Sequence, residues 1–432
     1  MGQFENWHCA KVNYLDSNKN LYQDTSFSNL QISKFLKLMH YICPMQLSVI
    51  ILNYNVRYFL EQCVLSVEKA IHNLDAEIIV VDNHSTDDSC AMMQKRFPHI
   101  KLIQNRENFG FPKGNNIGFK KAKGEYLCIL NPDTVVAEDT FEKILNSQFL
   151  TSNSQLGIVG CKLIDGTGHF LPESKRGVPT PWVAFTKIFG LYKVFPNTVW
   201  FNRYYAQQLD ENQTGSVDIL VGAFMVMKRQ LYQELEGFDE ACFMYADDID
   251  LSYRSLLLGK KNYYFAETTV IHYKGESTIK DAVYMKHFRE FMNFFYKKHF
   301  NSSLFFNLMA RFGAFYFSVV KVFTSKSKPV VKPKRYLLVS DTEALKEKIS
   351  AVLQKSVERI AMENGKIVIS QSISKAKDTE IILDIQSIGF KNAIAFMESH
   401  KDKAFTFKLL PEGSSFIIGS NHSNDKGEVI NL

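Results

Sequence analysis

The chain has 432 residues, a length that allows two or three domains of ordinary size. With 46% hydrophobic and 13% aromatic residues it can build packed cores, which excludes a disordered chain. Its net charge of +6 is too small for the dense basic stripe of a dedicated nucleic-acid-binding protein, so we expect no nucleic-acid partner. None of the seven cysteines forms a CxxC pair, a spacing that argues against a zinc ribbon or a disulfide framework and favours a reducing cytoplasm.

The first 30 residues are polar and lack the apolar segment that a secretion signal needs, and the stretch after them, SKFLKLMHYICPM, is short and mildly amphipathic. The extension expected here covers residues 1–44. We expect them to form a poorly structured extension that contributes little to the fold. Met45 directly precedes the first strong strand pattern, and a translation start there would fit this expectation.

Strand and helix patterns alternate regularly after Gln46. Apolar, β-branched runs indicate strands, and apolar residues at helical spacing indicate the helices between them. The predicted strands are 47–55, 77–83, 100–105 and 125–130, and the predicted helices are 57–72, 87–97 and 113–122. This alternation predicts an α/β fold with a mostly parallel sheet and helices on both faces.

After residue 150 the strand and helix patterns no longer alternate regularly. Strand patterns occur at 155–164, 169–174, 260–266 and 268–273, a strand pair and a helix lie within 217–235, and helices are predicted at 247–259 and 280–300. We therefore expect one large domain over residues 45–300.

Residues 301–335 form a predicted apolar or amphipathic helix and a basic linker. The run 304–323 is long enough to just span a bilayer, but Arg311 and Lys321 interrupt it. Lysines and prolines follow it at 326–335. Two interpretations stay open: peripheral contact with the inner face of the cell membrane, or a core helix that packs two domains together.

Residues 336–432 are predicted to form a smaller, Rossmann-like α/β domain. Strands are expected at 335–340, 366–370, 380–384, 404–410 and 415–419, and helices at 342–363 and 390–400. No GxGxxG motif follows the first of these strands, so dinucleotide binding is not predicted.

Polar residues gather where the strands of the first half end. Asn53, Tyr54 and Asn55 follow the first strand, and Asn131 and Asp133 follow the fourth. The second strand ends in Asp82, Asn83 and Ser85. Each set alone is explained by turns or helix caps. Three sets at the edge where open α/β sheets bind ligands indicate a binding site.

Six segments follow one another over residues 46–300: LSVIILNYN, EIIVVDNHSTDDS, NRENFGFPKGNNIGF, YLCILNPDT, VDILVGAFMVMKRQLYQELEGFDEACFMYADDIDLSYR and VIHYKGEST. In this order they resemble the GT-A-fold glycosyltransferases of family 2, most closely the bacterial rhamnosyltransferase-like enzymes that build surface polysaccharides. The resemblance implies an inverting hexosyl or deoxyhexosyl transferase. Its donor would be a UDP- or dTDP-sugar and its acceptor a hydroxyl of a glycan or lipid-linked glycan, at the cytoplasmic face of the cell envelope.

The nucleotide sugar is expected along the first four strands. The Asp82 carboxylate can accept the imide N–H of uracil or thymine, as the resemblance also implies, and Tyr54 offers an aromatic wall. Asn83 and Ser85 either bond the ribose or cap the next helix. The glycine-rich GFPKGNNIG segment is a tight loop or a phosphate cradle. The candidate residues are Asn53, Tyr54, Asn55, Asp82, Asn83, Ser85, Lys113, Asn115, Asn131 and Asp133.

A divalent metal is expected at Asp133, because carboxylate oxygens suit Mg²⁺ or Mn²⁺. The family's metal motif is DxD, and Asn131 stands in its first position here, which removes one charge from the site. The resemblance implies that His272 is the second protein ligand.

The catalytic base is expected at Asp248, onto which the resemblance maps the second member of the family's acidic pair. Asp247 and Asp250 crowd the same helix start, where helix-dipole compensation accounts for one of them. We expect their charges to raise the pKa of Asp248. On the acceptor side we place Gly222, Ala223 and Asp247. Arg176 belongs there too, as a contact for a lipid-linked diphosphate or as a solvated surface residue.

Three other functions compete with this one. The first is a polyprenyl-phosphate glycosyl transferase, in which lipid phosphate itself is the acceptor. The second is a nucleotidyltransferase, which usually has a glycine-rich basic loop after its first strand, and 52–62 offers none. The third is a non-catalytic assembly subunit, against which the combined presence of Asp82, Asp133, Asp248 and His272 argues.

Overall fold

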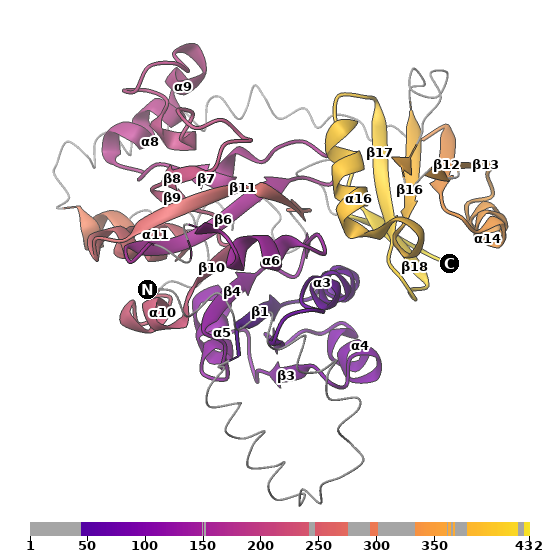
Figure 1. Cartoon of the computed structure of the whole chain (residues 1–432), viewed down its shortest axis with the longest axis horizontal. Helices are drawn as coiled ribbons and strands as arrows, with labels where there is room; N and C mark the ends of the chain where they lie inside the picture. Colours follow the sequence, from indigo (N-terminus) through magenta and orange to yellow (C-terminus); the bar gives the residue numbers. More distant parts are fainter. Residues whose placement is uncertain are drawn as a thin grey trace, which may run out of the picture. The chain divides into compact units, whose positions relative to one another are not determined.

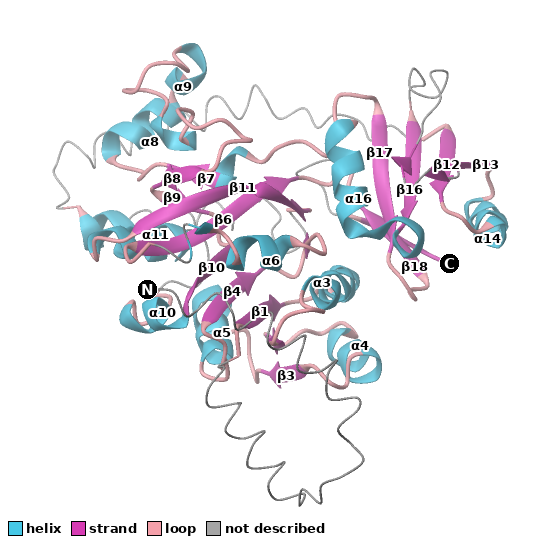
Figure 2. Ribbon diagram, in the orientation of Figure 1, coloured by secondary structure: helices cyan, strands magenta, loops and turns pink. Residues whose placement is uncertain are grey.

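The computed structural model describes residues 45–148, 150, 153–241, 247–274, 294–300, 333–360, 362–363, 366–367, 378–421 and 427–432. The predictions for 1–44, 304–323 and most of 280–300 lie outside these residues. Residues 46–432 belong to one compact unit, which contains a nine-stranded and a six-stranded sheet (Figures 1 and 2). The predicted α/β class, with a mostly parallel large sheet and a smaller C-terminal α/β sheet, is confirmed.

The first half of the large sheet is parallel, in the order β3-β2-β1-β4. Its elements are β1 (Leu47–Asn53), α3 (Arg57–Ala70), β2 (Ala76–Asp82), α4 (Ser89–Arg96), β3 (Lys101–Gln104), α5 (Gly110–Phe119) and β4 (Tyr126–Leu130). Every residue of β1 is buried, as expected of a strand that is covered on both faces. All seven predicted elements of this half are present, and α5 begins three residues earlier than predicted.

The second half of the large sheet is mixed. Its elements are β5 (Thr134–Val135), α6 (Thr140–Leu145), β6 (Leu156–Ile164), β8 (Gly215–Val217), β10 (Phe224–Lys228), α10 (Arg229–Glu234), α11 (Asp247–Leu257) and β11 (Lys261–His272). Strand β10 lies antiparallel between β4 and β6, whereas β11 runs parallel to β6 and antiparallel to β5. The two strands predicted between 260 and 273 are a single strand, β11, whose register shifts between Phe265 and Thr269.

The predicted strand at 169–174 is wrong. Phe170 makes only an isolated bridge to Ile164, and the 3-10 turn η2 (Pro172–Ser174) follows. Pro172 lacks the N–H that a central strand donates. The next elements are β7 (Lys175–Arg176), α8 (Pro181–Ile188), α9 (Leu191–Val194), η3 (Arg203–Tyr205) and β9 (Ile219–Leu220), which pairs with β7.

The small sheet has the order β13-β12-β16-β17-β18-β19. Its elements are β12 (Arg335–Val339), α14 (Glu343–Leu353), β13 (Val357–Ile360), β16 (Thr379–Asp384), α16 (Ile385–Ser399), β17 (Phe405–Leu410), β18 (Phe416–Gly419) and β19 (Glu428–Asn431), with β14 (Met362–Glu363) and β15 (Lys366–Ile367) as a separate pair. The helix predicted at 342–363 ends at Leu353. Gln354 adopts a left-handed conformation (φ 52°) that terminates α14, and β13 follows.

The two sheets share a hydrophobic cluster. Val135 and Ile271 at the edge of the large sheet pack in it with Phe390 and Ile394 of α16. The boundaries predicted between the two domains stay predictions, since 301–332 lie outside the described residues. Within the part of the chain that the structure describes, no helix is long and apolar enough to cross a membrane.

Candidate active site

The ends of β1 and β2 form one hydrogen-bonded unit. The buried Asn53 Nδ2 donates to Asp82 Oδ1 at 2.8 Å and to Ser85 Oγ at 3.0 Å. The backbone N–H of Ser85 donates to Asp82 Oδ2 at 2.9 Å. Each carboxylate oxygen of Asp82 thus already accepts one bond and can accept another. These three predicted residues are brought together and their geometry is fixed before any ligand binds.

Tyr54 and Asn55 continue this unit outward. The N–H of Asn55 donates to Ser85 Oγ at 3.0 Å, and Asn55 Oδ1 accepts the N–H of Thr86 at 2.7 Å. Asn55 has a positive φ of 55°, a conformation that Asn tolerates better than most residues. The Tyr54 side chain is 39% exposed, so its ring is available to stack on a planar ligand.

Asn83 and Ser85 do not cap α4, so that half of the prediction is wrong. Residue Asp88 is the N-cap of α4 and makes no side-chain cap bond. The Asn83 amide is used in shaping the loop before α5. Its Nδ2 donates to Asn108 Oδ1 and to the carbonyl of Gly110, and its Oδ1 accepts from the N–H of Phe109.

Packing accounts for Gly114 of helix α5, whereas Gly110 at its start has a positive φ of 78°. A Cβ at Gly114 would lie 2.4 Å from Leu52, so α5 approaches β1 closely only without a side chain there. The Lys113 ammonium lies 4.1 Å from the centre of the Phe109 ring. Asn115 Nδ2 donates to the carbonyl of Phe111, while its buried Oδ1 has no hydrogen-bond partner among the described residues.

Asn131, Asp133 and His272 meet where β4 ends and β11 ends. His272 Nε2 lies 3.4 Å from Asp133 Oδ1 and 3.4 Å from Asn131 Nδ2. The N–H of Tyr273 donates to the carbonyl of Asp133 at 3.0 Å and fixes the two segments to each other. The buried oxygens Asp133 Oδ1 and Asn131 Oδ1 have no hydrogen-bond partner within the described part of the chain.

This donor set fits a divalent cation with two protein ligands. No group of three or more His, Cys, Asp or Glu side chains that could hold a metal occurs among the described residues. Mg²⁺ commonly takes one or two protein ligands and completes its shell with substrate phosphates and water. Asp133 Oδ1 and His272 Nε2 converge as such a site requires.

The two carboxylate oxygens of Asp248, at the start of α11, differ in their hydrogen bonds. Asp248 Oδ2 accepts Arg176 Nη2 at 2.6 Å and the N–H of Gly222 at 3.0 Å. Asp248 Oδ1 is buried and has no hydrogen-bond partner among the described residues. A Cβ at Gly222 would stand 3.3 Å from Asp248 Cβ, so glycine permits this close approach.

Arg176 is not a solvated surface residue. It is largely buried in β7, and its Nη2 also donates to the carbonyl of Leu220 at 2.9 Å. Burial lowers the pKa of the guanidinium, but the neighbouring Asp248 carboxylate outweighs burial, and the net pKa is raised. Arg176 is therefore a permanent positive charge on the predicted base, and the expected solvent-exposed alternative is wrong.

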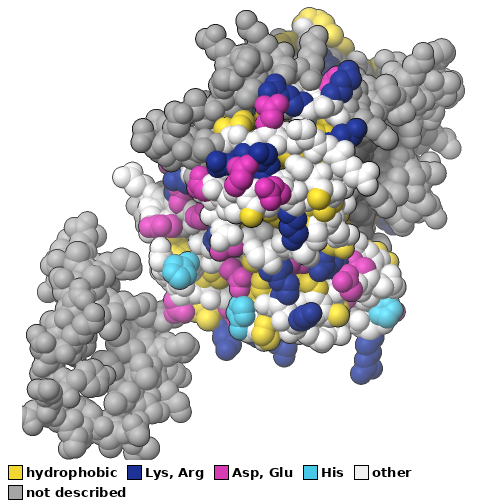
Figure 3. All heavy atoms as spheres, turned by 90° about the vertical axis from the view of Figure 1, so that its right-hand side faces the viewer, with side chains coloured by type: hydrophobic (Ala, Val, Ile, Leu, Met, Phe, Trp, Pro, Cys, Tyr) yellow, Lys and Arg dark blue, Asp and Glu magenta, His cyan; other side chains and the backbone are white. Residues whose placement is uncertain are grey.

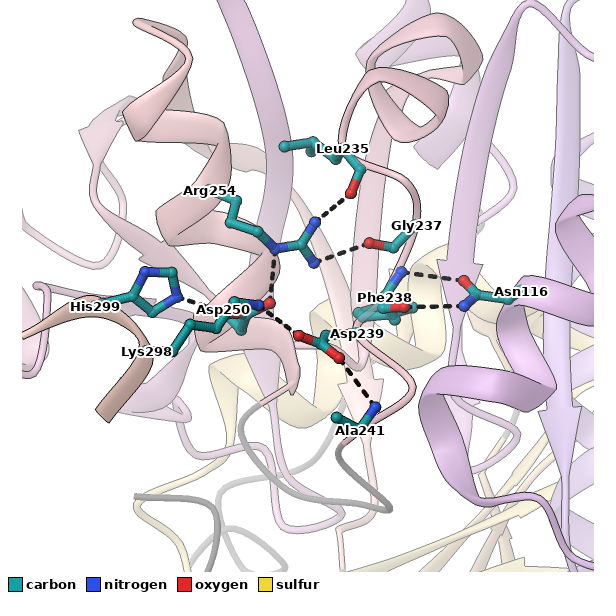
Figure 4. A network of polar contacts seen from close by, with 10 residues as sticks. All are labelled: Asn116, Leu235, Gly237, Phe238, Asp239, Ala241, Asp250, Arg254, Lys298 and His299. Atoms are coloured by element: carbon teal, nitrogen blue, oxygen red, sulfur yellow. Dashed lines mark hydrogen bonds and ion pairs between the residues drawn. The ribbon is translucent and has the colours of Figure 1, made fainter. Parts of the chain in front are cut away.

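The expected like-charge effect falls on Asp247. Burial and then the Asp248 charge raise the pKa of Asp247 to about 8. Asp250 differs because it accepts Arg254 Nε and His299 Nε2, each at 2.7 Å (Figure 4). Burial raises the pKa of Asp250, but the Arg254 charge and the hydrogen bonds from His299, Lys298 and Arg254 outweigh burial, and the net pKa is lowered. Asp250 thus holds α11 in place, a role that its spacing alone did not reveal.

Two basic residues near the site were not predicted. The Lys187 ammonium of α8 lies 3.5 Å from the centre of the Tyr204 ring, and burial lowers its pKa. Lys274 follows His272 by two residues and pairs with Glu173. Lys274 could have been found from the sequence, because it lies two residues after His272. Lys187 could not, because its position depends on the packing of α8.

Parts of the chain are similar to known glycosyltransferases. Residues 48–236 match the model of Glycosyl transferase family 2. An N-acetylglucosaminyl-diphospho-decaprenol L-rhamnosyltransferase of Mycobacterium tuberculosis is 23% identical over 246 residues, 54% of this chain and 78% of the relative. The O-antigen biosynthesis protein RfbC of Myxococcus xanthus is 25% identical, over 48% of this chain but 16% of its own length. A Pyrobaculum calidifontis mannosyltransferase solved with GDP-Man and Mn²⁺ has 15% identity and a TM-score of 0.43, over 80% of this chain and 89% of that one.

Proposed function

We propose that this chain, whose residues 48–236 form a glycosyl transferase family 2 domain, moves a hexosyl or deoxyhexosyl group from a UDP- or dTDP-sugar to a hydroxyl of a glycan or lipid-linked glycan, with inversion. The observation that carries this proposal is the Asp248 carboxylate. Arg176 and Gly222 hold one of its oxygens, and the other has no hydrogen-bond partner among the described residues. An inverting transfer needs one such positioned base.

The nucleotide would bind over the ends of β1 and β2. Asp82 has acceptor capacity for the imide N–H of uracil or thymine, and the exposed Tyr54 ring can stack on the base. Ser85 Oγ is within reach of the same edge, whereas Asn83 shapes the loop behind it.

In the transfer step the acceptor hydroxyl gives its proton to Asp248 Oδ1. Its oxygen bonds to the anomeric carbon from one face while the bond from that carbon to the diphosphate oxygen breaks on the other. Arg176 keeps the carboxylate oriented during this step because it donates to the opposite oxygen at 2.6 Å. The nucleoside diphosphate leaves with the negative charge.

Asp133 and His272 would hold the divalent cation, Mg²⁺ or Mn²⁺. Such a cation supplies charge compensation for the departing diphosphate. Asn131, whose buried Oδ1 has no hydrogen-bond partner among the described residues, would offer an amide oxygen where a DxD motif has a carboxylate. The site therefore has one acidic protein ligand, and its affinity would depend strongly on the bound nucleotide.

The acceptor class is supported by the relatives. The mycobacterial relative's name pairs rhamnosyl transfer with a diphospho-decaprenol-linked sugar, and that of RfbC refers to O-antigen biosynthesis. We therefore place this chain in cell-surface polysaccharide synthesis, in the cytoplasm at the inner face of the membrane.

The test of this function is product analysis. The full chain is incubated with UDP- and dTDP-sugars, Mn²⁺ and a lipid-linked glycan, and the anomeric configuration of the product is read by NMR. We expect a new glycosidic bond of opposite configuration to the donor. A product with retained configuration contradicts the base mechanism, sugar on lipid phosphate supports a polyprenyl-phosphate transferase, and no transfer from any donor supports a non-catalytic subunit.

A further inference from the structure

The exposed apolar side chains of the described residues are concentrated in one place. We call residues 181–201, which contain α8, α9 and the turn after them, the aromatic segment. More than half of the large hydrophobic side chains with high exposure belong to it: Trp182, Val194, Phe195, Val199 and Trp200. Trp200 is 72% exposed and Val194 is 66% exposed. Such a contiguous patch marks an interaction surface.

The rings of the aromatic segment are held by one another. The ring centres of Trp182 and Phe185 are 5.5 Å apart, and those of Phe195 and Phe201 are 5.2 Å apart. Trp182 Nε1 donates to the carbonyl of Trp200 at 2.8 Å. This surface is therefore preformed, and its binding to a partner would require little ordering.

The charged residues within this stretch of the sequence have one sign. From Ser174 to Leu209 the sequence contains no Asp or Glu but five basic residues, of which Lys193 and Arg203 are exposed. By contrast, Lys and Arg side chains are interspersed with Asp and Glu side chains on the face shown in Figure 3. Exposed Trp and Phe beside exposed Lys and Arg are the combination that suits an anionic membrane interface.

The inner side of the segment reaches the candidate active site. The N–H of Gly177, directly after Arg176, donates to the carbonyls of Arg203 and Tyr204. Lys187 of α8 covers the Tyr204 ring, and Arg176 binds Asp248. The turn η3 contacts both α8 and β7, the strand that carries Arg176, and in Figure 1 α9 lies beyond α8. The exposed rings thus lie on the acceptor side of the base.

We infer that the aromatic segment docks the protein on the surface of an anionic lipid bilayer, with its rings at the headgroup level. Docking itself does not depend on glycosyl transfer. Its use in presenting a lipid-linked acceptor to Asp248 rests on the proposed function. This surface is separate from the apolar run 304–323, which lies outside the described residues.

The test uses the full chain and vesicles of phosphatidylcholine with and without phosphatidylglycerol. We expect Phe195→Ser/Trp200→Ser to weaken binding to the anionic vesicles at least about tenfold, because two interfacial rings are lost. The matched control is Leu257→Ser/Leu258→Ser, which removes two exposed hydrophobic residues from the end of α11 and should leave binding unchanged. Lys193→Glu should weaken binding to the anionic vesicles only.

Two results would overturn the inference: no binding of the native chain to the anionic vesicles, or native-like binding by Phe195→Ser/Trp200→Ser. The second result would assign the membrane contact to another segment, such as 304–323. Asp248→Asn separates this inference from the proposed function, because it should bind vesicles like the native chain even where transfer is lost. Vesicle binding without any transfer activity would leave the docking surface standing and the proposed function overturned.

Discussion

The two neighbouring carboxyl groups at the start of α11 have different surroundings. Asp248 has a cation on one oxygen, because Arg176 Nη2 lies 2.6 Å from it. Asp247 is also buried, and its pKa is raised to about 8 by burial first and by the Asp248 charge second. Asp247 is therefore mostly protonated at neutral pH, which reduces the repulsion that two adjacent carboxylates would suffer.

This difference predicts how stability depends on pH. The folded pKa of Asp247, about 8, lies above the model value of 3.8, so the folded chain retains a proton that the unfolded chain releases between these values. Stability then falls as pH rises through that window, at most by ~1.4 kcal/mol per pH unit. Asp247→Asn removes the effect.

The measurement is the melting temperature of Asp247→Asn and the native chain from pH 4 to pH 8. We expect the variant to gain on the native chain as pH rises. A constant difference across this range would mean that Asp247 does not titrate there.

The roles of residues within a motif could be predicted from the sequence. The roles of residues that depend on a partner far away in the sequence could not. Asn131, Asp133 and His272 were predicted as one site and lie together. Asn83 was predicted to bond ribose or cap a helix, yet its amide is used by the loop at 108–110. Arg176 pairs with Asp248, 72 positions away, and no local sequence pattern predicts such a contact.

The predicted metal site is formed by the ends of two strands, since Asp133 directly precedes β5 and His272 is the last residue of β11. We expect UDP or dTDP to raise the melting temperature of the native chain only when Mn²⁺ or Mg²⁺ is present, by mass action on a shared site. Asp133→Ala should lose the metal-dependent part of that shift. Equal stabilisation by the nucleotide in excess chelator would contradict the metal site.

Helix α16 depends on Glu138, which lies in the segment between β5 and α6. Its helical conformation is interrupted at Gly389 (φ 74°), and it restarts with the N–H groups of Phe390 and Lys391 donating to the Glu138 carboxylate at 2.7 Å each. A carboxylate at a helix N-terminus satisfies donors that would otherwise have no partner. Glu138 follows Asp133 by five residues, so the cap also anchors the segment after this proposed metal ligand.

We expect Glu138→Ala to lower the free energy of unfolding by about 0.5–2 kcal/mol. Urea denaturation measures this change, with Glu347→Ala on the exposed face of α14 as the control. If the two variants are equally stable, the Glu138 contact contributes nothing.

Helices and strands could likewise be predicted where the local sequence pattern determines them. The βα alternation of residues 47–130 gave every helix and strand, because both faces of the sheet are covered and the strands read as continuous apolar runs. The pattern at 342–363 joined α14 to β13, since nothing in the sequence marks Gln354 as left-handed. Strand β5 is two residues long and was missed for its shortness.

Across the whole molecule the two sheets depend on each other. Lys162 of β6 is almost fully buried and pairs with Glu398 of α16 at 2.5 Å. Lys162 Nζ also lies 3.6 Å from Glu211 Oε1, so two carboxylates from different parts of the chain compensate one buried charge. Contacts of this kind join segments more than 200 residues apart, so the sequence predicted both sheets but not their shared core.

The function assigned to the molecule depends on Asp248 as the base. The most direct measurement is turnover of Asp248→Asn at saturating donor and acceptor, with nucleotide affinity determined in parallel. Turnover should fall at least about a hundredfold, because general-base catalysis is typically worth 10²–10⁴ in rate. Nucleotide affinity should stay nearly unchanged, and Asp247→Asn should be milder. Near-native turnover of Asp248→Asn, with Asp247→Asn inactive, would assign the base to Asp247; near-native turnover of both variants would contradict the inverting mechanism.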